Sequence, residues 1–284
     1  MKILLKMIIQ WILTVVSIIL ISGLPALIMQ KDFRLYVQKV KEVALWLYRA
    51  GDMTYFYKGR EMPLFPEVLS PYFYSITILI ISLLLAYVMA QLLTWVTLLL
   101  PTFLRKLIKN VLTFFESLPD LLVFALMQIF IVYFYKKTHI LLSNVAAMGE
   151  QRIYIVPIVC LMILPTIYFY KMMVLLAEEE SQKPYFEFGR AKGLKDVYVY
   201  LFHVTRNTHE NLFHFSKTVL WFMISNLLLV EWIFNMNGIT HYMYDDFRPE
   251  ILAICLILIA VPFFVLYALL EWLLSRKMKE EVAL

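Results

Sequence analysis

The sequence predicts an all-α membrane protein with six transmembrane helices. Of its 284 residues, 62% are hydrophobic and only 17% are charged, which is more apolar surface than a soluble domain can bury. The apolar residues form long uncharged runs, and a helix needs about 20 such residues to cross a bilayer. Polar segments that carry Lys and Arg connect the runs. The net charge of +5 therefore fits a membrane-surface bias better than a nucleic-acid site.

Each apolar run predicts one span. The first follows Lys2 and Lys6, and we interpret it as a retained span because its apolar core is too long for a cleaved signal peptide. The second is uncharged from 71 to 104 and predicts one tilted helix that ends near Pro101. Arg105, Lys106 and Lys109 then form a short basic connection. The expected spans are 7–29, 71–101, 111–135, 153–176, 213–234 and 251–274.

The polar connections divide the chain into three parts. Residues 1–70 hold the first span and an extracytoplasmic loop, residues 71–275 hold five spans with a charged loop at 178–212, and residues 276–284 form a cytoplasmic tail. Six spans place both termini on one side of the membrane. That side has a slight excess of Lys and Arg, and most of those opposite lie in the long first loop, where the positive-inside rule gives them little weight. The pattern favours cytoplasmic termini.

The charged loop at 178–212 has internal order. Pro184 suits the first turn of a helix, after which Tyr185, Phe188 and Lys192 fall on one face. Gly193 suits the end of this helix, because glycine adopts the left-handed backbone at no steric cost.

A second short helix is expected after the glycine. Asp196 is placed to cap it through its carboxylate. The next residues, "VYVYLF", are β-branched and aromatic, so propensity alone favours a strand. We predict a helix here.

This loop resembles a motif in the membrane-spanning subunits of bacterial ABC importers of the dipeptide, oligopeptide and nickel type. The family motif is of the glutamate-alanine-alanine type, with a glycine six residues after the glutamate, and Glu187, Phe188 and Gly189 with Gly193 occupy it here. "YFEFGRAKGL" at 185–194 is also similar to the peptide-type form "YVRTARAKGL". "HVTRN" at 203–207 is similar to the family's "HxxRN". The resemblance implies that ATPase coupling involves Tyr185, Glu187, Gly189, Arg190, Ala191, Lys192, Gly193, His203, Arg206 and Asn207.

Two further segments carry the resemblance. "LLVEWIFNMNGI" is similar to "VVVExVFxxPGL" at the end of the family's fifth span, with Asn237 in place of the usual proline, and "ESLPDLLVFAL" shares the family's "SLP". The chain lacks the family's high glycine and alanine content and its Pro-Gly-Asp signature after the first span. These departures affect the assignment of the solute more than the assignment to the ABC importer class.

The resemblance implies a type I ABC importer transmembrane domain with a cytoplasmic coupling helix, in a bacterial inner membrane. The chain would be a permease subunit for a small solute, such as a dipeptide or oligopeptide, with nickel or another solute left open. Its expected partners are a second permease subunit, homologous or identical, two ATPases and an extracytoplasmic solute-binding protein. No "GxxxxGK[ST]" occurs in the chain, so ATP would be used by the partners and no cofactor is expected on this subunit.

Three acids inside the expected spans are candidates for the translocation pathway or gate. Glu116 and Asp120 fall one helical turn apart in the third span, where a carboxylate costs roughly 2.5 to 3.5 kcal/mol at mid-bilayer. They could meet a cationic solute, or Lys109 could neutralise them. Glu231 stands where the family has a glutamate, which implies a pathway role, and a hydrogen bond to a neighbouring span is the alternative.

Other function classes rest on weaker patterns. "HENLFH" fails the zinc-binding "HExxH" pattern because His209 and His214 are five apart and face different directions. Cys160 and Cys255 lie in apolar runs, so neither a metal site nor a disulfide framework is predicted. A polytopic membrane enzyme would need the two acids of the third span as its catalytic pair. An assembly factor on a permease-like scaffold is the remaining alternative.

Overall fold

The computed structural model describes residues 2–49, 53–57, 59–141, 144–149 and 151–282. Among these residues, six helices are long and apolar enough to cross a membrane, as the sequence predicts. The chain folds into two compact units, residues 1–76 with 238–284, and residues 77–237. The six candidate spans are Ile8–Ile28, Leu69–Leu99, Asp120–Thr138, Ile155–Glu180, Asp196–Ile233 and Pro249–Glu271.

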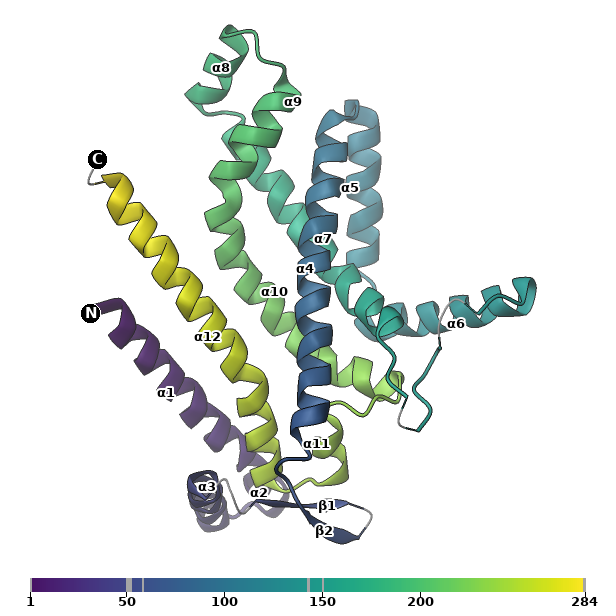
Figure 1. The fold of residues 1–284 in the computed structure, drawn as a ribbon, viewed down its shortest axis with the longest axis vertical. Helices are drawn as coiled ribbons and strands as arrows, with labels where there is room; N and C mark the ends of the chain where they lie inside the picture. The colour runs from purple at the N-terminus through teal and green to yellow at the C-terminus, as the bar shows by residue number, and fades with distance from the viewer. Residues whose placement is uncertain (1, 50–52, 58, 142–143, 150, 283–284) are drawn as a thin grey trace. The chain divides into compact units, whose positions relative to one another are not determined.

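The unit formed by both ends of the chain is built on two long helices. α1 (Lys2–Ser22) and α12 (Pro249–Val282) run side by side, and the start of α1 lies at the same end as the end of α12 (Figure 1). α2 (Leu24–Gln30) continues the first span after Gly23. α3 (Phe33–Tyr48) then packs against α1, α2 and α12. The polar segment after the first span is therefore partly helical.

A two-stranded hairpin completes this unit. β1 (Thr54–Tyr57) pairs antiparallel with β2 (Arg60–Pro63), so that Tyr55 lies opposite Met62. α11 (His241–Asp245) precedes α12. The hairpin follows α3 in the chain and leads to the start of α4.

An ion pair connects the hairpin to the start of α12. The Asp246 carboxylate accepts hydrogen bonds from the Arg248 guanidinium at 2.7 to 3.0 Å and from the Phe56 amide at 2.9 Å. Arg248 also donates to the Thr54 carbonyl at 2.8 Å, and its guanidinium carbon lies 4.7 Å from the centre of the Phe56 ring. The Trp46 ring of α3 lies 5.7 Å away. One side chain thus joins β1, α3 and α12.

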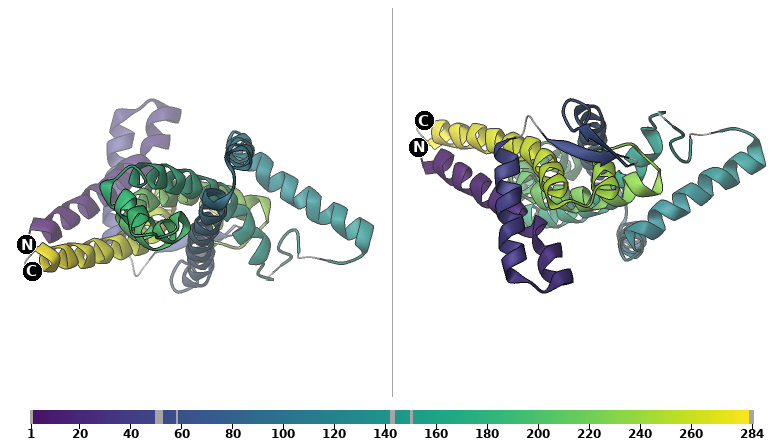
Figure 2. Two further views of the ribbon diagram at one scale, coloured as in Figure 1. Left: turned by 90° about the horizontal axis from the view of Figure 1, so that it is seen from above. Right: turned by 90° about the horizontal axis from the view of Figure 1, so that it is seen from below.

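The second unit contains four of the candidate spans and one further helix, α5. α4 (Leu69–Leu99) enters it, and α5 (Thr102–Glu116), α6 (Asp120–Thr138), α7 (Ile155–Glu180) and α10 (Thr205–Ile233) follow. α7 is the most deeply buried of the candidate spans and packs against α5, α6 and α10. α6 extends away from the other helices of this unit in both views of Figure 2.

Aromatic side chains join α4, α7 and α10. The Tyr87 ring meets the Phe169 ring edge-on at 5.6 Å between centres, and Phe169 meets Phe215 at 6.0 Å. The Tyr87 hydroxyl lies 2.9 Å from Nδ1 of His209. The first histidine of "HENLFH" thus has a hydrogen-bonding partner on a neighbouring helix.

The prediction of a single third span at 111–135 is wrong, because two helices occupy this region. α5 ends before Ser117 and α6 begins after Pro119. Proline has no amide hydrogen to donate and disfavours helical backbone in the residue before it, Leu118, so the chain turns here. The residues expected to form a basic connection lie instead in α5, and they are Arg105, Lys106 and Lys109.

Between α7 and α10 the chain forms a helical segment that we call the elbow, residues 181–204. It consists of α8 (Pro184–Ala191), α9 (Asp196–Tyr198) and the π-helix η2 (Val199–Val204), which runs directly into α10. The helix predicted for "VYVYLF" is therefore confirmed. Figure 1 shows α8 at one extreme of the second unit, beyond the ends of α4 and α5, with α9 next to it.

Candidate functional site

Both ends of α8 are set by the residues that the sequence indicates. Pro184 occupies the first helical position, where a missing amide hydrogen costs nothing. Gly193 has φ of +81°, a left-handed backbone that side-chain-bearing residues rarely adopt. The amides of Gly193 and Leu194 donate to the carbonyls of Arg190 and Gly189 at 2.9 and 3.1 Å. These bonds satisfy carbonyls that the end of the helix leaves free.

The inner side of α8 packs against η2. Phe186 is 1% exposed, and its ring centre lies 5.0 Å from that of Tyr200. A Cβ on Gly189 would lie 3.1 Å from Cγ2 of Val199, so only glycine fits there without displacement. The buried cluster around Phe186 comprises Leu98 of α4, Ala177 of α7, and Val199 and Val204 of η2.

Asp196 does not cap α9, which corrects the sequence prediction. Lys195 holds the cap position, and Asp196 is the first residue of the helix. Its carboxylate instead accepts two hydrogen bonds from the Arg190 guanidinium, at 2.7 and 2.6 Å. A bidentate, charge-assisted pair is a stronger partner for a carboxylate than free backbone amides. This pair connects the end of α8 to the start of α9.

Glu180 directly precedes the elbow, and the sequence analysis missed it. It ends α7 and is 6% exposed. Its carboxylate accepts from the Tyr185 hydroxyl at 2.7 Å and from Nζ of Lys183 at 2.5 Å, and Asn207 of α10 also hydrogen-bonds to it. Burial, with this bond to Glu180, raises the pKa of Tyr185 to about 12, so the hydroxyl keeps its proton at physiological pH. Glu180 joins α7, α8 and α10.

The outer side of α8 is exposed. Glu187, Ala191 and Lys192 are all exposed, and Phe188 is 64% exposed with Nζ of Lys192 lying 4.9 Å from its ring centre. Aromatic residues are enriched at protein–protein interfaces, so the Phe188 ring is a candidate contact for another protein.

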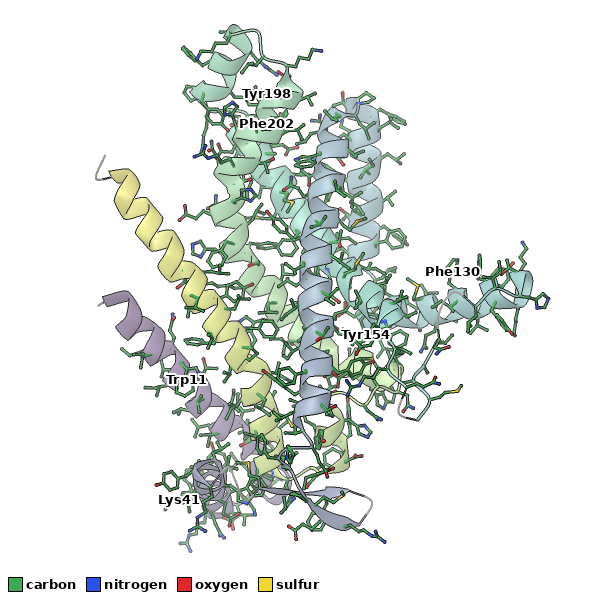
Figure 3. All side chains as sticks on the ribbon, in the orientation of Figure 1. Trp11, Lys41, Phe130, Tyr154, Tyr198 and Phe202 are labelled. Atoms are coloured by element: carbon green, nitrogen blue, oxygen red, sulfur yellow. The ribbon has the colours of Figure 1, made fainter. Side chains whose placement is uncertain are left out.

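A second exposed aromatic group lies on the same elbow. The rings of Tyr198 and Phe202 are 4.7 Å apart at their centres, and both side chains are exposed (Figure 3). Of the other predicted coupling residues, His203 and Arg206 are exposed, whereas Asn207 bonds to Glu180. The structure thus places the predicted residues on the elbow and on the first turn of α10, and the elbow has a packed inner side and a solvent-exposed outer side.

The structure does not place Glu116 and Asp120 on consecutive turns of one span. Glu116 ends α5 and forms an ion pair with Lys171 of α7. Asp120 begins α6 and is hydrogen-bonded by Asn226 of α10. The break at Pro119 separates the two acids, so each has a partner on a different helix.

The remaining polar candidates are also accounted for in the described part of the chain. Lys109, expected near the two acids, pairs with Glu178 at 2.6 Å. Glu231 is 2% exposed in the last turns of α10, and its carbonyl accepts from the Met236 amide at 2.8 Å. Among the residues that the structure describes, no group of three or more His, Cys, Asp or Glu side chains is placed to hold a metal ion.

A comparison with protein families bears directly on this arrangement. The family model of the binding-protein-dependent transport system inner membrane component matches residues 82–280, well over half of the chain. The chain belongs to this family. It is therefore the permease subunit of an ABC importer, a multi-pass membrane protein of a transport family and not of an enzyme family. No curated protein matches the chain.

Membership confirms part of the sequence analysis. The six-helix fold of the permease is that of a type I ABC importer transmembrane domain, and its family works with ATPase and binding-protein partners. The match includes the whole elbow and begins after α3 and the hairpin.

Proposed function

We propose that this permease forms half of the import pathway for a dipeptide or oligopeptide, and that its elbow is the attachment point for a cytoplasmic ATPase. The observation that carries the proposal is the two-sided construction of α8. Its inner side is fixed by Phe186 and Glu180, while its outer side presents Phe188 among charged residues. The similarity of "RAKGL" and "HVTRN" to the peptide-type motif supports the solute class.

The contacts of α8 define how force would pass from the ATPase to the spans. The Phe186 cluster includes residues of α4, α7 and η2, and Glu180 adds Asn207 of α10. Because these groups are packed and hydrogen-bonded, α8 cannot move without displacing the ends of α7 and α10. ATP-driven closure of the ATPases then biases the spans between inward-open and outward-open states.

The proposed assembly contains two permease subunits, two ATPases and one solute-binding protein. A pathway at the interface between two permeases requires the second subunit, homologous or identical to this one. ATP is bound and hydrolysed by the partner subunits, and the chain has both termini in the cytoplasm.

The ATPase attachment is tested at Gly193. A Cβ there meets no atom within 4 Å, so Gly193→Val acts only through the backbone, where the left-handed conformation costs about 1–2 kcal/mol for an ordinary residue and more for a β-branched one. We expect the ATPase that co-purifies with the permease to fall several-fold. Gly193→Asn is the matched control, because asparagine tolerates this conformation. Unchanged co-purification with valine, at equal permease levels in the membrane, contradicts the proposal.

The pathway role proposed for Glu231 is tested by Glu231→Gln. The substitution keeps the shape of this buried side chain and one acceptor oxygen, and it replaces the other carboxylate oxygen with a neutral, donating amide nitrogen. We expect solute uptake to fall several-fold while ATPase co-purification stays unchanged. Undiminished uptake would assign Glu231 to a structural hydrogen bond.

The solute class is tested on the cognate extracytoplasmic binding protein. We expect unlabelled dipeptides and oligopeptides to displace a labelled peptide from it. Displacement by nickel ions, and not by peptides, would overturn the peptide assignment and leave the ATPase attachment unaffected.

A further inference from the structure

α3 is an amphipathic helix that begins almost where the first membrane span ends. The span reaches Ile28, and α3 starts at Phe33. Asp32 caps α3 by accepting from the Arg34 amide at 2.8 Å. Only Lys31 and Asp32 separate α2 from α3, and these two helices pack against each other, so the chain turns between them. We propose that α3 is an interfacial helix, which lies along the phospholipid headgroups of this leaflet with one face in the acyl chains.

Contacts with the span set the depth of α3. The Tyr36 hydroxyl donates to the Leu20 carbonyl at 3.3 Å, and a Cβ on Gly23 would lie 2.9 Å from Cγ2 of Val40. Leu20 lies in the last turn of α1, and Gly23 lies between α1 and α2, so both belong to the end of the candidate span Ile8–Ile28. A helix in contact with both residues is therefore at the membrane boundary and not in bulk water.

One exposed face of α3 is apolar. At about 100° per residue, Phe33, Val37, Ala44 and Tyr48 fall within a sector of about 60°. Phe33 is 66% exposed and Tyr48 is 89% exposed. Val43 points elsewhere and is fully buried in the unit. We call this exposed face the α3 stripe. At the depth of the span's end, acyl chains are the surroundings that suit it.

Basic residues lie next to the α3 stripe. Arg34, Lys41 and Arg49 are all exposed and follow the stripe around the helix, on the side away from the buried face. The row also contains one apolar side chain, Leu45, which is 65% exposed and falls between Arg34 and Arg49. Figure 3 shows Lys41 on α3. Around the helix, the order is packed core, apolar stripe and basic row, as expected for a helix between spans and lipid phosphates. Because the basic side chains complement lipid phosphates and the apolar stripe suits acyl chains, we assign phospholipid as the partner of the α3 stripe.

The proposed lipid contact gives α3 a role in positioning the first and last spans in the membrane. α3 packs against both α1 and α12, and Trp46 of α3 lies beside Arg248 at the start of α12. A helix held at the headgroups fixes the depth at which these spans sit. This role is independent of the solute and of the ATPase, and α3 lies before the region matched by the family.

The test places a reporter on the stripe of the full-length permease. Phe33→Cys and Tyr48→Cys are each labelled with an environment-sensitive fluorophore in liposomes of phosphatidylethanolamine and phosphatidylglycerol. Gln38→Cys, exposed on the polar side of the same helix, is the matched control. Cys160 and Cys255 are buried, so the unsubstituted chain measures background labelling. Nitroxide-bearing lipid and aqueous iodide serve as the two quenchers.

We expect lipid nitroxide to quench the two stripe labels several-fold more than the control label, with the reverse order for iodide. Combining Arg34→Gln with Lys41→Gln should reduce lipid quenching of the Tyr48→Cys label when phosphatidylglycerol is present. Equal access of iodide to all three positions overturns the proposal, because it places the stripe in water. Protection from both quenchers also overturns it, because a protein then covers the stripe.

Discussion

Replacing Phe186 by alanine is expected to release α8 from the elbow and uncouple the permease from its ATPase. The side chain is fully enclosed by residues of α4, α7 and η2, and truncating a buried phenylalanine costs about 3–5 kcal/mol. An eight-residue helix has too little stability of its own to persist without this contact. Amide hydrogen exchange of residues 184–193 in the membrane-embedded permease should rise by two or more orders of magnitude, and co-purifying ATPase should be lost.

Two controls separate the packing of α8 from its outer contact. Phe186→Leu keeps most of the buried volume and should retain both exchange protection and ATPase. Phe188→Ala removes an exposed ring, so exchange should stay slow while ATPase binding weakens. If Phe186→Ala leaves exchange at 184–193 unchanged, the inner cluster does not hold the elbow and the lever mechanism fails.

The elbow shows which parts of a site the sequence can predict. Pro184 and Gly193 act through their own backbone chemistry, so their positions alone indicate where α8 begins and ends. Phe186 and Glu180 act through neighbours that are distant in sequence, such as Leu98 and Asn207. Glu180 also follows two other glutamates, and no local pattern tells which of the three is buried.

The third expected span is wrong for a different reason, because here the sequence does contain a local signal for a helix break, but the apolar composition favours a continuous helix. Composition favoured one continuous span across 111–135, although Pro119 stands within it and disfavours helical backbone before it. A helix break changes the direction of the chain, so a spacing of four residues no longer places Glu116 and Asp120 side by side. Their partners, Lys171 and Asn226, come from packing that the sequence does not display.

Removing the Arg248 side chain is expected to release the hairpin from the start of α12. Asp246 is 6% exposed, and Arg248→Ala would leave its carboxylate buried with two backbone amides, those of Phe56 and residue 248, as donors and no positive charge beside it. Breaking one side of a buried pair costs roughly 3–5 kcal/mol, and the partial exposure of Arg248 places the loss near the lower end. Amide exchange of β1 should accelerate about 100-fold, at 1.4 kcal/mol for each factor of ten.

A double variant and acidification distinguish the ion pair from simple packing. Arg248→Met with Asp246→Asn removes both charges, so exchange of β1 should return most of the way to that of the unsubstituted permease.

Burial opposes ionisation of Asp246, but the hydrogen bonds from Arg248 and the Phe56 amide outweigh it and lower the pKa below the ordinary 3.8. The stabilisation is therefore complete above the ordinary pKa and is lost as the pH falls through the lower pKa of the folded state. Exchange of β1, corrected for its intrinsic pH dependence, should stay constant between about pH 5 and 8 and rise only in stronger acid. If exchange of β1 in the double variant is as fast as in Arg248→Ala, the guanidinium acts by packing between Phe56 and Trp46 and not by neutralising Asp246.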